Sequence, residues 1–136
     1  MKEKYKEIFD EVMDEIESSL KDPGGIITHQ RRLAFSLSFG MVTLIEFYLD
    51  KLNVLKPGAK INHLWLKKKK ENAKKLISSQ ITSQVGDIKN IDKILDVAFK
   101  IESERNELVY GKKVSEKILN KKINLFLDLK KELEND

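Results

Sequence analysis

The sequence predicts an all-α fold: an up-and-down four-helix bundle with an additional short lysine-rich helix. Three observations support this class. Apolar residues recur at three- and four-residue steps along most of the chain. Only two prolines and six glycines are present, so few positions interrupt a long helix. No stretch alternates apolar and polar residues as a half-buried strand does. We expect positions 1–136 to form a single domain around one core.

The first two expected helices are joined by a short turn. The first runs from about Lys2 to Leu20 and ends before Asp22–Gly25, where proline and glycine break the helix. The second runs from about Thr28, a suitable N-cap, to Leu52. It is apolar on most sides, which indicates a central, buried helix. Its most apolar stretch, Leu33–Leu49, is interrupted by polar residues, so we expect a core helix and no membrane span.

The third expected helix, from about Leu64 to Ile81, is short and rich in lysine. Lysines at positions 67–70 and 74–75 surround a thin apolar stripe. The whole chain has 26 basic and 22 acidic residues, so most lysines have an acidic residue to pair with. A solvated surface of lysine and glutamate is the simpler interpretation. A nucleic-acid footprint on these lysines stays open, whereas a helix-turn-helix DNA reader is disfavoured because no compact three-helix unit is evident.

The last two expected helices are long. The fourth starts near Asp87 or Asn90 and reaches about Val109, and Gly111 suits its end. The fifth runs from about Ser115, a suitable N-cap, to Leu133. The short connection between these two helices, like that between the first two, favours antiparallel neighbours.

Arg105 stands on the apolar face of the fourth expected helix. It follows Ile101 by four residues and precedes Leu108 by three, where a solvated arginine is not expected. A structural explanation is an ion pair with Glu46, which interrupts the most apolar helix and itself needs a partner. A functional explanation is that the guanidinium, beside Asn106, binds two oxygens of a phosphate. The two are compatible, because Glu46 can hold an arginine that also binds a ligand.

Composition excludes several kinds of catalytic site. Without cysteine, the chain has no disulfide, thiolate zinc site or cysteine nucleophile. His29 and His63 each stand alone at a helix start, without the Glu-x-x-His spacing of di-metal bundles, and we interpret both as surface or capping groups. Gly24-Gly25 lacks the Lys-Ser/Thr of a phosphate-binding loop, and no serine sits in a nucleophile elbow. We expect neither a metal nor a cofactor.

The stretch from Arg105 to Lys112, Arg-Asn-Glu-Leu-Val-Tyr-Gly-Lys, resembles the signature of the HEPN domain family. That signature is an arginine, four to six residues and then a histidine, commonly with asparagine after the arginine. In the HepT-type toxins it is similar to Arg-Asn-x-Leu-Val-His-x-Tyr. The chain length, the helical bundle and the place of the motif before the last helix also agree. Tyr110 stands where the family has histidine, and Lys112 stands where these toxins have tyrosine.

The resemblance implies a metal-independent endoribonuclease in which two chains bring both motifs into one cleft. Arg105 and Asn106 would lie at the catalytic site, with Arg105 steadying the scissile phosphate and Lys112 helping to bind RNA. The family histidine would activate the ribose 2′-hydroxyl or protonate the leaving oxygen. Tyr110 in its place is a poor base at neutral pH, because a free phenol titrates near ~10.

We therefore expect an RNA-associated HEPN-like domain, a weakened or inactive ribonuclease of a toxin–antitoxin or defence system. The implied partners are RNA, a second copy of the chain and a nucleotidyltransferase antitoxin. The alternative is a non-catalytic structural or protein-interaction bundle in which Arg105 is a core ion-pair partner. The charged segment Met1–Glu7 has no apolar signal core, and together with the missing cysteines it predicts a cytoplasmic protein.

Overall fold

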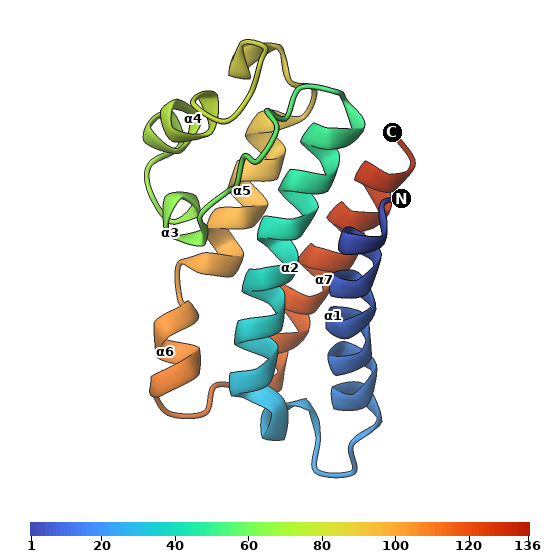
Figure 1. Ribbon diagram of the computed structural model, residues 1–136. Coiled ribbons are helices and arrows are strands. Elements are labelled where there is room, and N and C mark those ends of the chain that lie inside the picture. Colours follow the sequence, from blue (N-terminus) through green and yellow to red (C-terminus); the bar gives the residue numbers. More distant parts are fainter.

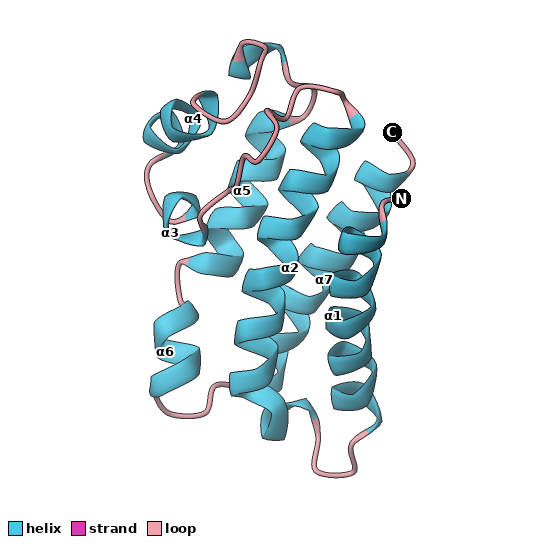
Figure 2. Cartoon of the chain, in the orientation of Figure 1, coloured by secondary structure: helices cyan, strands magenta, loops and turns pink.

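The four longest helices pack side by side around one apolar core (Figure 1). They are α1 (Glu3–Lys21), α2 (Gln30–Lys51), α5 (Ile91–Glu102) and α7 (Glu116–Glu134). The shorter segments are α3 (His63–Leu66), α4 (Lys70–Ser78), α6 (Arg105–Tyr110) and the 3-10 turns η1 (Ile26–His29) and η2 (Val85–Asp87). The computed structural model describes residues 1–136 and contains no strand, which confirms the predicted all-α class (Figure 2).

Helix α2 is the central element. It packs against α1, α5, α6 and α7, and its buried side chains cover most of its circumference, whereas Phe35 and Phe39 on the remaining face are about half exposed. This is the arrangement that its nearly continuous apolar surface predicts. The segment Ile26–Lys51 is long and apolar enough to cross a membrane by length and composition alone, but 61% of its apolar window is buried inside the fold. Those contacts account for its apolar character.

Gly40 allows α1, α2 and α7 to approach closely. A Cβ atom at this position would lie 3.0 Å from the Phe126 ring of α7 and 3.2 Å from the Val12 side chain of α1. A side chain at this position would therefore push the Phe126 and Val12 side chains away by a few tenths of an ångström. The glycine therefore sets how tightly the first, second and last helices pack.

The fourth expected helix is broken in two, because α5 ends at Glu102 and α6 starts at Arg105 (Figure 2). At the break, the buried Lys122 ammonium of α7 donates to the Lys100 carbonyl at 2.6 Å. In an unbroken helix that carbonyl would accept from the amide of Glu104. The lysine thus takes the place of a helical hydrogen bond, and α6 follows in a new direction against α2.

The third expected helix is also broken, into α3 and α4. The residues between them, Lys67, Lys68 and Lys69, are all exposed. Most helical stability in proteins comes from burying an apolar face, and three consecutive lysines offer none. The apolar residues on either side, Leu66 and Ala73, are buried.

Candidate functional site

The largest cleft in the molecule holds Arg105. It has a volume of about 980 Å³ and lies between α2, the loop before α3, α3 itself and the start of α6. We call it the Arg105 cleft. Its wall includes aromatic and basic side chains, which are Phe35, Phe39, Lys60, His63, Trp65 and Arg105. Glu11 of α1 is the one acidic side chain among the lining residues.

The Arg105 guanidinium is stacked over an aromatic ring and is not ion-paired. Its central carbon lies 4.9 Å from the centroid of the Phe35 ring. Its Nη1 reaches the Asn106 side-chain oxygen only at 3.5 Å, and no carboxylate lies within 4.0 Å of its nitrogens. Its Nε is buried without a hydrogen-bond partner. The guanidinium therefore retains donors for a ligand.

The expected ion pair between Arg105 and Glu46 is not formed, so that structural hypothesis is wrong. Glu46 instead accepts a hydrogen bond from the backbone amide of Ile61 at 2.8 Å. Burial raises the pKa of the Glu46 carboxyl. Glu46 follows Phe35 by eleven residues on α2, which places it roughly 16 Å further along the helix than the ring that Arg105 covers. The helical pattern gives this spacing along α2, but it could not show that Arg105 lies over Phe35.

A buried carboxylate does lie beside the cleft, and it belongs to Glu102. This residue is 1% exposed at the end of α5. Its Oε1 accepts a hydrogen bond from the hydroxyl of Ser38 on α2. Its Oε2 lies 3.4 Å from Nδ1 of His63, which lines the cleft. His63 and Glu102 were not predicted as site residues, because the chain separates them by 39 positions.

Only three buried side-chain nitrogen or oxygen atoms lack a hydrogen-bond partner: Nδ1 of His63, Oε2 of Glu102 and Nε of Arg105. His63 and Arg105 line the same cleft, and Glu102 lies against His63. Two of the three, Nδ1 of His63 and Oε2 of Glu102, face each other at 3.4 Å and serve as each other's partners, so Nε of Arg105 is the one left without a partner.

The remaining motif residues lie outside the cleft wall. Asn106 is exposed and contacts Arg105 as described. Tyr110 is 79% exposed, makes no hydrogen bond through its hydroxyl and does not line the cleft. Lys112 is exposed, and its backbone carbonyl accepts a hydrogen bond from the side-chain amide of Gln30 at 3.1 Å. The structure thus brings Arg105 and Asn106 together but does not bring Tyr110 or Lys112 to the cleft.

The lysine cluster of the third predicted helix is only partly neutralised. Lys70 pairs with Asp96 at 2.9 Å, and Lys74 pairs with Asp92 at 2.7 Å. Lysines 67–69 form no ion pair. They directly follow α3, whose Trp65 lines the Arg105 cleft, so free positive charge continues from the cleft along the surface.

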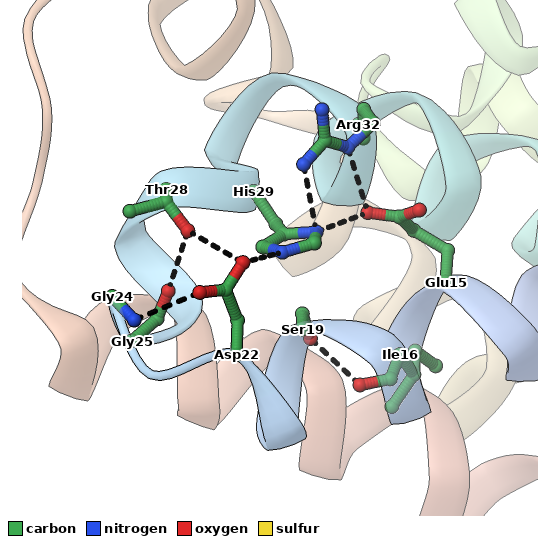
Figure 3. Close-up of polar contacts among 9 residues, drawn as sticks. All are labelled: Glu15, Ile16, Ser19, Asp22, Gly24, Gly25, Thr28, His29 and Arg32. Carbon is green, nitrogen blue, oxygen red and sulfur yellow. Dashed lines mark hydrogen bonds and ion pairs between the residues drawn. The ribbon is translucent and has the colours of Figure 1, made fainter.

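A second polar cluster surrounds His29 at the opposite end of α2 from the α2–α3 loop (Figure 3). His29 is buried, with Nδ1 2.8 Å from Glu15 and Nε2 2.7 Å from Asp22. Both carboxylates raise the pKa of the imidazole. Arg32 also approaches Nδ1, at 2.9 Å, but a carboxylate at each ring nitrogen favours the protonated ring. The interpretation of His29 as a surface group is therefore wrong, because it ties α1 to the start of α2.

No group of three or more histidine, aspartate or glutamate side chains is placed to hold a metal ion. Comparisons with models of known protein families, with curated proteins and with solved structures found no match to this chain. The function therefore has to be argued from the residues of the Arg105 cleft.

Proposed function

We propose that this chain is an HEPN-like, RNA-associated domain that binds single-stranded RNA in the Arg105 cleft. The observation that carries the proposal is the state of Arg105, which is stacked on Phe35, free of any carboxylate and positioned in the largest cleft. A guanidinium in that state suits a phosphate oxygen, because its planar fork donates two hydrogen bonds in fixed directions.

The rest of the cleft suits the bases of a single strand. Phe35 and Phe39 lie one helical turn apart on α2, and Trp65 faces the same cleft from α3. Stacking of a base on an aromatic ring contributes about 1–3 kcal/mol and tolerates any base. A duplex would hide its bases in the helix stack, so an unpaired strand is the form that these side chains can use. Lys60 and the free lysines 67–69 would attract its backbone.

The stretch Arg105–Val109 resembles the HEPN signature, and this resemblance supports a wider proposal. In this wider proposal the four long helices form an up-and-down bundle, and two chains pair so that both copies of the motif face one cleft. A nucleotidyltransferase is the partner in a cytoplasmic toxin–antitoxin or defence system. If catalytic, the domain is a metal-independent endoribonuclease weakened by the loss of the motif histidine. Light scattering tests the pairing, for which a monomer at all concentrations would be the contrary result.

The RNA proposal is tested by fluorescence anisotropy with a labelled, unstructured RNA oligonucleotide at low salt. Arg105→Ala should weaken binding by about 10- to 150-fold, the value of one charge-assisted contact of ~1.5–3 kcal/mol. Arg31→Ala is the matched control, because Arg31 is exposed, unpaired and outside the cleft. Absence of binding by the wild type, or equal losses in the two variants, would contradict the proposal.

The second candidate is a protein-interaction module, and the exposure of apolar side chains around the cleft favours it. Phe35, Phe39 and Leu64 are each about half exposed and line the same cleft. Exposed apolar groups gathered in one place commonly mark a docking surface. A protein partner held by these side chains would bind nearly independently of salt, whereas RNA binding would weaken steeply as salt rises.

A further inference from the structure

We infer that His63, oriented by Glu102, is the proton-transfer residue of the Arg105 cleft and supplies the base that the Arg105–Lys112 motif lacks. The inference rests on the proposed function, because it concerns RNA bound in that cleft. It gives a role to a histidine that lies 42 positions before Arg105 in the sequence and outside any recognisable motif.

The position of His63 suits this role. Its side chain is 37% exposed and lines the cleft together with Arg105. Its Nδ1 is buried and faces the Glu102 carboxylate at 3.4 Å. The exposed part of the ring is therefore the part that carries Nε2. A ligand phosphate held by Arg105 would lie in the same cleft as that nitrogen.

The surroundings of Glu102 determine which ring nitrogen carries the proton. Oε1 already accepts the Ser38 hydroxyl, and the only nitrogen of a basic side chain within 4.0 Å of Oε2 is Nδ1 of His63. A buried carboxylate accepts hydrogen bonds, so the proton of the neutral imidazole belongs on Nδ1. The lone pair is then on Nε2, where it can accept a proton. Glu102 also stabilises the imidazolium that results, as the carboxylate does in other carboxylate–histidine pairs.

The reaction that these groups support is transesterification within RNA. Nε2 of His63 takes the proton of a ribose 2′-hydroxyl, and the 2′ oxygen forms a bond to the adjacent phosphorus. The bond from phosphorus to the 5′ oxygen of the next nucleotide breaks, and Arg105 offsets the charge on the phosphate oxygens. The departing 5′ oxygen takes a proton from water, and the hydroxide left behind takes the proton from His63. The products are a 2′,3′-cyclic phosphate and a 5′-hydroxyl, and the site returns to its starting state.

In this scheme His63 is a catalytic residue and Glu102 is a positioning residue. Tyr110 has no part, which agrees with its exposure outside the cleft. The need for the 2′-hydroxyl makes RNA the only substrate, because an otherwise identical strand with one 2′-deoxyribose at the scissile position lacks the nucleophile.

The test follows cleavage of a labelled single-stranded RNA in EDTA, with binding measured in parallel by anisotropy. Wild type should cut the RNA to fragments ending in a 2′,3′-cyclic phosphate and should bind but not cut the 2′-deoxy substrate. His63→Ala and His63→Gln should bind RNA within about threefold of wild type and cut it ~10²- to 10⁴-fold more slowly. Added imidazole should partly restore cleavage by His63→Ala. Tyr110→Phe is the control and should cut like wild type.

Glu102→Gln is the test of positioning. It retains an acceptor for the Ser38 hydroxyl and removes the charge that faces His63. We expect a loss of ~10- to 100-fold in cleavage together with a shift of the limb of the pH–rate profile near neutrality, where histidine side chains ionise. A variant that lost only stability would cut less but keep the wild-type pH profile, and that result would overturn the positioning role.

Two further results would overturn the inference and leave the RNA-binding proposal intact. One is undiminished cleavage by both His63 variants. The other is a wild type that binds RNA but does not cut it in EDTA. A wild type that fails to bind RNA at low salt would refute the proposed function itself and the inference with it.

Discussion

Replacing Arg105 with alanine should hardly change the stability of the fold. The side chain has no carboxylate partner, so the substitution leaves no buried charge unpaired. The interaction lost is the stacking on Phe35 at 4.9 Å, worth about 0.5–1 kcal/mol at a partly exposed site. Two other effects of the substitution stabilise the fold: it removes a buried Nε that has no hydrogen-bond partner, and it places alanine, a strong helix former, in α6. The free energy of unfolding should therefore change by less than about 1 kcal/mol.

Urea denaturation followed by circular dichroism measures this change directly, provided that the slope with denaturant is the same for both proteins. Phe35→Leu is the matched variant, and the double variant with Arg105→Ala gives the coupling energy, which we expect to be about 0.5–1 kcal/mol. Breaking a buried ion pair costs about 3–5 kcal/mol. A loss of that size in Arg105→Ala would refute the conclusion that this arginine is held free for a ligand.

Two further predictions concern the fold. Glu15 and Asp22 raise the pKa of His29, so the contribution of His29 to stability is full below about pH 6.5 and is lost as the pH rises through the raised pKa. The hydrogen bonds from the Gly24 amide and His29 lower the pKa of Asp22, so the contribution of Asp22 to stability is lost as the pH falls through the lowered pKa. The urea midpoint, measured as a function of pH, should be highest between these two transitions. His29→Gln should remove the loss of stability at the alkaline side, and an unchanged loss there would contradict a charged imidazole. Gly40→Val should lower the free energy of unfolding by about 1–3 kcal/mol, because the valine side chain would meet Phe126 and Val12. Gly86→Val is the control and should change this free energy little, because the space around Gly86 is open. Equal effects of the two substitutions would contradict the close packing at Gly40.

The sequence was sufficient for the parts of the fold that depend on local pattern. The apolar periodicity predicted the extents of α1, α2 and α7 to within about two residues. Ser115 caps α7, as expected, by accepting a hydrogen bond from the Ile118 amide. Thr28 was wrongly predicted as a cap, because it lies inside η1, its hydroxyl donates to the carbonyl of Gly25 just before η1, and α2 starts two residues later.

The site depended on contacts between distant parts of the chain, which a pattern in one helix cannot show. At the break after α5, the carbonyl of Lys100 accepts a hydrogen bond from Lys122, which lies 22 positions further along the chain. Glu102 was passed over because it stands beside the apolar stripe, and its partner Ser38 lies 64 positions away. The interruption of an apolar helix by Ser38 was a usable signal of a polar contact in the core. Arg105 was identified by the same kind of signal, although its neighbour proved to be Phe35 and not Glu46.

Trp65 provides the most direct measurement of the central claim, that the Arg105 cleft binds single-stranded RNA. It is the only tryptophan in the chain and lines the cleft, so its fluorescence reports on this site alone. Titration with an unstructured RNA oligonucleotide at low salt should quench the fluorescence to a plateau, and Arg105→Ala should shift the midpoint at least about tenfold higher. Fluorescence that does not change while RNA is added, or quenching that is the same with and without Arg105, would contradict the claim.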